Sequence, residues 1–306
     1  MDLDTCLLIW TAAMASWAAG AVWLAQVSGY PLWPLVGRGE FERFYAAWAR
    51  GARSTIQVPL FLCLAGAAGA LWLGPKGIPP WALWLGFGLQ LTLAGLTLSW
   101  WSPPAARILV PGGGLDAPAH TRLQASHWVR VALVTAHLAL ACWMVAHHPW
   151  APRQGQPQAS QWLLLATAAL GFYASGQIWM VQTLCYRLWP LVGGAAFYDY
   201  HMAWWRSIWT VIFVPSGLTL AGAVALLWMR PPEVDPMLLR LGLGLQALLY
   251  LLTAAWWGPL MSRLATREQG LLAPRYRLMT TTHWLRVAIV SGYGLVALRA
   301  LMQTLA

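Results

Sequence analysis

The second half of the chain repeats the first at a fixed distance of 156 positions, the separation of Gln26 from Gln182 and of His127 from His283. This register holds through apolar segments and loops without a gap, so it indicates that an entire bundle was duplicated. We therefore expect two similar units, residues 1–147 and 161–306, joined by a Pro- and Gln-rich linker at 148–160. Other matching pairs are Trp33-Pro34 with Trp189-Pro190, Arg50 with Arg206, and Trp100-Trp101 with Trp256-Trp257.

The composition sets the class of protein. Hydrophobic residues make up 59% of the chain, charged residues make up 9%, and the mean hydropathy is +0.56. These values lie outside the range of soluble globular domains and indicate an integral membrane protein. The first apolar stretch, 7–27, is too long for the core of a signal peptide, and we expect it to be retained as a membrane span.

Eight stretches are long enough to cross about 30 Å of hydrocarbon as helices. The expected fold is therefore all-α and polytopic, with eight transmembrane helices arranged as two four-helix repeats. We place the spans near residues 5–27, 55–74, 80–101, 122–147, 161–185, 208–229, 237–257 and 277–304.

The distribution of Lys and Arg predicts the orientation. The loops after spans one, three, five and seven carry twelve arginines, among them Arg38, Arg107 and Arg263, whereas only four basic residues lie near span ends on the opposite side. The positive-inside rule then places both termini outside the cytoplasm. Because each unit has an even number of spans, the two repeats are expected to be parallel.

The basic residues account for the net charge of +10 without a nucleic-acid partner. They sit in short loops beside spans, where anionic lipid headgroups are the expected partners. The four cysteines have no CxxC spacing and occupy non-equivalent positions in the two units, so neither a disulfide framework nor a thiolate metal site is expected.

A helical pattern that is too short to cross the membrane lies between spans one and two. Phe41, Phe44, Tyr45 and Trp48 recur at helical spacing, and Phe197, Tyr200, His201 and Trp204 repeat the pattern in the second unit. The pattern predicts an interfacial helix after the first span of each repeat. We favour an anchor in the headgroup plane over a lid above a site. His201 replaces Tyr45 and is either a divergent anchor or a sign that one unit has specialised.

The most specific polar constellation is His127-Trp128-x-Arg130, repeated as His283-Trp284-x-Arg286, at the start of spans four and eight. Residues at i and i+3 share a helix face, so each His stands beside its Arg. Ten residues beyond each first His, that face continues with His137 in span four and Tyr293 in span eight. Polar side chains at such depth are expensive in hydrocarbon and usually point into a bundle.

Two interpretations of this stripe remain open. If spans four and eight face each other, His127 and His283 could ligate a haem-like tetrapyrrole whose propionates meet Arg130 and Arg286. A quinone or another anionic lipophilic ligand could use the same donors. The plainer alternative is that each His braces its own bundle and each Arg snorkels to lipid phosphate.

Several reaction classes lack their motifs. The chain has no H-E-x-x-H, no G-x-S-x-G and no P-loop, and no paired carboxylates fall in a predicted span. The run Gly112-Gly113-Gly114 is expected to be a loop turn, because no Lys-Ser/Thr accompanies it. Hydrolysis, phosphoryl transfer and carboxylate-coupled proton pumping therefore have little support.

The segments 30–37, 197–201 and 283–286 resemble those of uncharacterised bacterial four-helix membrane proteins. In that family an aromatic-Pro-Leu segment leads through Val-Gly to a Phe-x-x-Tyr-His stretch, and the last helix opens with a polar residue before Trp-x-Arg. The first unit departs from it with Phe44-Tyr45 in place of Tyr-His, and both last helices begin with His where Asn is expected. The resemblance implies the fold and its duplication, but no activity. We expect a multi-pass location in a bacterial inner (cytoplasmic) membrane.

Three functions follow as hypotheses. The first is a non-enzymatic subunit or scaffold of a larger membrane complex, suggested by abundant aromatics and by small residues that permit close helix packing. The second is a redox protein that binds haem, quinone or pigment through the His/Arg stripes. The third is a transporter whose two halves rock about their common axis.

Overall fold

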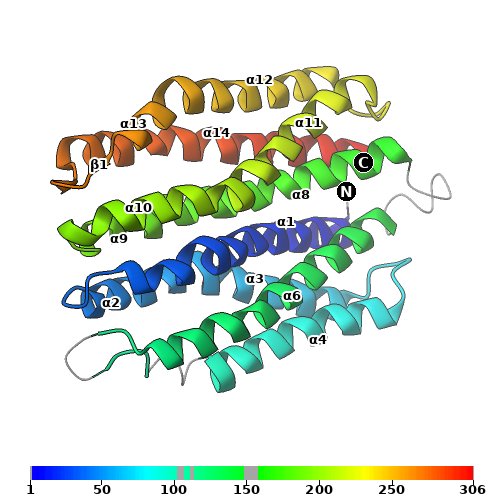
Figure 1. Cartoon of the computed structure of the whole chain (residues 1–306). Coiled ribbons are helices and arrows are strands. Elements are labelled where there is room, and N and C mark those ends of the chain that lie inside the picture. The colour runs from blue at the N-terminus through cyan, green and yellow to red at the C-terminus, as the bar shows by residue number, and fades with distance from the viewer. Residues whose placement is uncertain (1, 102–106, 111–113, 148–157, 306) are drawn as a thin grey trace.

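The computed structural model describes residues 2–101, 107–110, 114–147 and 158–305. Most of the linker predicted at 148–160 and the glycines Gly112 and Gly113 therefore lie outside the described residues. Within the described ranges the chain forms eight helices that are long and apolar enough to cross a membrane. The protein is an all-α polytopic membrane protein (Figure 1).

The first repeat is built from helices that are joined in places by wider π turns. Its helices are α1 (Leu3–Leu24), α2 (Phe41–Ala52), α3 (Val58–Leu73), α4 (Pro80–Leu96) and α6 (Ala117–His147). A π turn at Ala25–Gly29 and a 3-10 turn at Tyr30–Leu35 extend α1, and π turns at Arg53–Gln57 and Thr97–Trp101 follow α2 and α4.

The second repeat has the same order of elements. Its helices are α8 (Ala159–Met180), α9 (Tyr186–Leu188), α10 (Gly194–Ile208), α11 (Val214–Trp228), α12 (Pro236–Leu252), α13 (Gly258–Ser262) and α14 (Ala273–Leu305). The π turns lie at Val181–Cys185, Trp209–Phe213 and Thr253–Trp257, and a 3-10 turn spans Trp189–Leu191. Strands β1 (Ala265–Thr266) and β2 (Gly270–Leu271) form an antiparallel hairpin, and Leu109 bridges Leu115 at the equivalent place in the first repeat.

Prolines explain three of these π turns. Pro59 and Pro215 follow the π turns after α2 and α10 by two residues, and Pro259 stands in the same relation to the turn after α12. Proline donates no backbone hydrogen bond and its ring crowds the carbonyl four residues earlier, so a widened turn accommodates it. The carbonyl freed by Pro215 is that of Val211, and Gln177 Nε2 donates to it at 2.6 Å.

The segment expected in the headgroup plane is helical, but it continues directly into the next span. Helix α2 runs through its π turn into α3 to form one helix of 33 residues, Phe41–Leu73. Its aromatic face turns inward. Phe41, Phe44 and Trp48 are buried, and Phe41 and Trp48 pack on Trp33. The helix therefore differs from a separate surface anchor, because the 3-10 turn after α1 supplies an apolar partner for that face.

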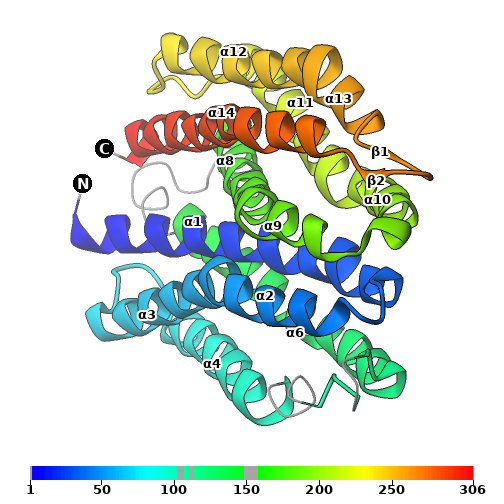
Figure 2. The same ribbon diagram turned by 90° about the vertical axis from the view of Figure 1, so that its left-hand side faces the viewer.

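The two repeats join through α1 and α8, which lie side by side in the middle of the bundle (Figures 1 and 2). Gly20 of α1 lies against the backbone carbonyl of Tyr173, and Gly176 of α8 lies in the same way against that of Trp17. Each contact is the other moved by 156 positions, which is the reciprocity that a twofold axis imposes. Small residues at these points allow the two backbones to touch.

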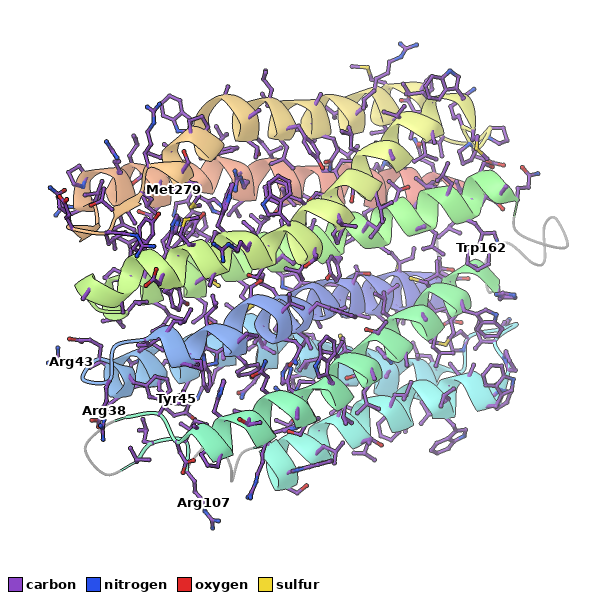
Figure 3. All side chains as sticks on the ribbon, in the orientation of Figure 1. Arg38, Arg43, Tyr45, Arg107, Trp162 and Met279 are labelled. Carbon is purple, nitrogen blue, oxygen red and sulfur yellow. The ribbon has the colours of Figure 1, made fainter. Side chains whose placement is uncertain are left out.

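The remaining helices flank this central pair on both sides. In the first repeat α3 and α6 pack on α1, and α4 packs on both of them; in the second, α11 and α14 pack on α8, and α12 packs on both (Figure 2). The N- and C-terminal ends lie together at one end of the bundle (Figure 1). Arg38, Arg43 and Arg107 lie at the opposite end, which we call the arginine-rich end (Figure 3).

Candidate ligand-binding site

Each repeat brings a group of polar and aromatic side chains together where two of its π turns meet its last long helix. In the first repeat the π turns contribute Gln26, Thr97 and Trp101, and α6 contributes His127 and Arg130. The equivalent residues of the second repeat are Gln182, Thr253, Trp257, His283 and Arg286. Widened turns of this kind are frequent at functional sites. We call these groups the first and the second site.

The imidazole in each site has a fixed tautomer. Gln26 Nε2 donates to the carbonyl of Gln124 at 3.2 Å, so its Oε1 faces His127 Nδ1 at 2.8 Å. An amide oxygen only accepts, and Nδ1 must therefore carry the proton. In the neutral ring this leaves Nε2 as a bare acceptor, and this buried atom has no partner within the described chain. The second site repeats the pair, with His283 and Gln182 at 2.9 Å.

Each arginine lies over the ring of a tryptophan. The guanidinium carbon of Arg130 is 4.2 Å from the ring centre of Trp101, and that of Arg286 is 4.3 Å from the ring centre of Trp257. Arg130 also donates, at a long 3.5 Å, to Thr97 Oγ1, and it lines the same cavity as Tyr30. Its Nε has no partner among the described residues. Stacking on an indole face offsets part of the cost of removing a guanidinium from water.

No carboxylate balances these charges. Within the described ranges the structure has one ion pair, between the exposed side chains of Arg267 and Asp199 at 3.6 Å. Arg130 is 8% exposed, so a full positive charge is held in the bundle with aromatic and hydroxyl neighbours alone. A buried charge without a counter-ion is expensive, and such groups in membrane proteins mark functional sites by default.

The two sites differ in the space beside the arginine. Arg130 lines a cavity of about 310 Å³, together with Tyr30, Tyr45, Trp101 and residues of α2 and its π turn. This volume is at the lower end of the range for small-molecule sites. The equivalent cavity beside Arg286 and His283 measures about 50 Å³, which is room for only a few water molecules.

The structure brings together four of the predicted site residues, two in each repeat, and separates the others from them. His137 is fully buried deeper in α6, next to Gly86 of α4, and not beside Arg130. Tyr293 packs on Gly171 and Gly242 in a small apolar cluster of the second repeat. Ten residues of helix span about 15 Å. His137 and Tyr293 therefore lie on the same helix faces as the sites but outside the sites.

His201 lies near the second site without lining its cavity. Its ring stacks on Phe197 and meets Trp189 edge-on, and Nε2 is 3.2 Å from Met261 Sδ. Met261 does line the cavity. The histidine that replaces Tyr45 is thus a buried packing group, and its Nε2 lies beside a thioether, which is a weak partner.

The arrangement in which spans four and eight face each other is not formed. Helix α6 packs on α1 and α4, whereas α14 packs on α8 and α12, and the α1/α8 pair lies between them (Figure 2). His127 and His283 therefore belong to separate sites and do not meet across the axis. The physical reason is that small residues let α1 and α8 approach each other most closely. The last helix of each repeat, α6 or α14, therefore lies outside this central pair.

Gln26, Tyr30, Thr97 and Trp101 were not predicted as site residues. The sequence did contain a signal for them, because the same residue type stands 156 positions after each of them. A buried glutamine is also costly in a span unless both ends of its amide are bonded.

Comparisons with models of known families, with curated proteins and with solved structures gave no match.

Proposed function

We propose that the protein is a non-enzymatic membrane protein that binds an amphipathic ligand with a hydrogen-bond-accepting or anionic head. The observation that carries this proposal is the buried guanidinium of Arg130, which has no carboxylate partner and faces a cavity of about 310 Å³. Five N–H donors and a fixed positive charge favour carbonyl, carboxylate or phosphate oxygens. Aromatic walls from Tyr30, Trp48 and Trp101 suit the apolar part of such a molecule.

A tetrapyrrole is less well supported than a smaller head group. The proposed bis-histidine geometry needs His127 and His283 on one group, but their helices α6 and α14 pack on opposite sides of the α1/α8 pair. His127 is not among the residues that line the larger cavity, and the cavity that His283 does line measures about 50 Å³. A quinone head or an anionic lipid head makes smaller demands on space and uses the arginine directly.

The test compares the molecules that co-purify with the chain and with a variant carrying both Arg130→Gln and Arg286→Gln. Mass spectrometry of extracts from the detergent-purified proteins should find an acceptor-bearing amphiphile in the wild type at near-stoichiometric amount. We expect the double variant to lose most of it. Equal amounts in both proteins would contradict the proposal, and an absorption spectrum of the same samples tests the tetrapyrrole alternative.

Membership of a larger membrane complex is a second proposal, supported by a different observation. Gly88 of α4 and Gly244 of α12 occupy equivalent positions, and a side chain added at either would meet no atom within 4 Å. Several other glycines of the spans, such as Gly66 and Gly222, already contact neighbouring helices of this chain. Open small positions can admit a partner helix. Purification in a mild detergent without stoichiometric companions would argue against this second proposal.

The structure gives little support to transport by rocking of the two halves. The two halves touch backbone to backbone at Gly20 and Gly176, and Ser207 Oγ donates to Ser28 Oγ across the interface at 2.8 Å. The π turns surround the candidate sites near the arginine-rich end.

We also propose, from the positive-inside rule, that this end is cytoplasmic in a bacterial inner membrane, where it meets anionic headgroups. An active periplasmic reporter fused to the C-terminus would agree with this orientation, whereas an inactive one would contradict it.

A further inference from the structure

One helix face accounts for the difference between the two cavities. In the first repeat Ala49, Ala52, Arg53 and Gln57 line the larger cavity from α2 and its π turn. The residues 156 positions later are Trp205, Ile208, Trp209 and Phe213. Small and polar residues at these four positions are thus replaced by large apolar ones, while the arginine, tryptophan, threonine and tyrosine of the site are unchanged.

The large residues fill the second site. Trp205, Ile208 and Phe213 line what remains of its cavity, and Trp209 stacks on Phe213 with ring centres 4.6 Å apart. Arg286 and His283 therefore share their cavity with large, mostly aromatic side chains. The space left there can hold a few water molecules but no head group.

The first site instead gains a second positive charge. Arg53 lies at the exposed rim of the larger cavity and Arg130 lies in its interior. The described part of the chain offers neither of them a carboxylate within ion-pairing distance. Two cations without a counter-ion favour a head with a full negative charge over a neutral quinone carbonyl.

We infer that the two sites have diverged, so that only the first binds ligand, and that this ligand is a lipid with an anionic phosphate head. The inference rests on the proposed function and narrows it to one repeat and one chemical class. The phosphate would lie between Arg53 and Arg130, both of which line the larger cavity. The second site keeps the same framework as a structural element of its repeat.

The test is native mass spectrometry of the full chain in detergent with added phosphatidylglycerol. We expect one tightly retained lipid per chain, and weaker retention of phosphatidylcholine, whose head has no net charge. Arg53→Gln changes an exposed residue and should leave the fold intact, yet it should weaken retention by about tenfold, the loss typical of one charge-assisted contact. Ala49→Trp copies the second repeat and should abolish retention at an unchanged melting temperature.

Arg130→Gln and Arg286→Gln form the matched pair. We expect the first to remove the bound lipid and the second to leave it in place. If both weaken retention equally, the divergence of the sites is wrong, although the proposed function stands. If neither variant alters the binding of any amphiphile, the proposed function itself fails. Free glycerol phosphate that binds as tightly as the lipid would overturn the lipid assignment.

Discussion

At the scale of residues, the molecule satisfies its buried polar groups in pairs that recur after 156 positions. The Gln26–His127 pair is supported by the backbone carbonyl of Gln124, so one amide holds both a helix and an imidazole. Trp101 accepts the guanidinium of Arg130 on its face and donates through Nε1 to Ser126 Oγ at 3.1 Å. Gln26 and Trp101 thus make two contacts each, which joins the residues of the site into a single framework.

Replacing Gln26 with Leu tests this framework. The substitution leaves the buried Nδ1–H of His127 without an acceptor, and we expect it to destabilise the protein by about 1–3 kcal/mol. Gln182→Leu should have a similar effect, because its two contacts have nearly the same lengths as those of Gln26, 2.9 against 2.8 Å and 3.1 against 3.2 Å. The measurement is thermal unfolding in detergent. Variants as stable as the wild type would show that these bonds do not support the fold.

At the scale of elements, the sequence predicts the spans but not what covers their faces. Apolar length and flanking prolines place the eight spans close to where they lie, since both follow from the thickness of the membrane. The aromatic pattern of α2 predicts an amphipathic helix correctly. It cannot reveal that Trp33 covers that face, because the partner comes from a 3-10 turn without periodicity.

The site was only partly predictable for a similar reason. His127 and Arg130 stand out because charged or titratable residues are rare in spans, whereas Gln26 and Thr97 are ordinary residues until the π turns aim them inward. The central position of α1 and α8 had a signal in their content of Ala, Gly, Ser and Thr, which suits close packing. Without that signal, the position of α6 relative to α14 could not be derived from amphipathicity.

The contact between α1 and α8 predicts a sharp difference between two glycine substitutions. Gly20→Ala places a methyl group into the carbonyl of Tyr173, and we expect a marked loss of stability. Gly88→Ala meets open space in α4 and should be neutral or slightly stabilising, by up to about 1 kcal/mol, because alanine is the better helix former. Melting temperatures of the two variants in one detergent decide the matter. Equal shifts would contradict the close α1/α8 contact.

At the scale of the whole molecule, a central helix pair with parallel four-helix repeats on either side explains why the protein has two sites rather than one shared site. Phe44 and Tyr200, which are equivalent positions, meet at ring centres 6.2 Å apart and mark the axis near the arginine-rich end. Everything that lies away from this axis occurs twice. Divergence can then act on one copy while the other keeps the fold.

Disulfide crosslinking between the repeats tests this arrangement most directly. In a chain whose four cysteines are replaced by alanine and whose linker carries a protease site, Ser28→Cys with Ser207→Cys should crosslink, since their hydroxyls are 2.8 Å apart. The control is Ser126→Cys with Thr282→Cys, equivalent positions on α6 and α14 that lie on opposite sides of the α1/α8 pair. We predict that after cleavage only the first pair holds the two halves together on a non-reducing gel. Crosslinking of the second pair, with none in the first, would contradict the account.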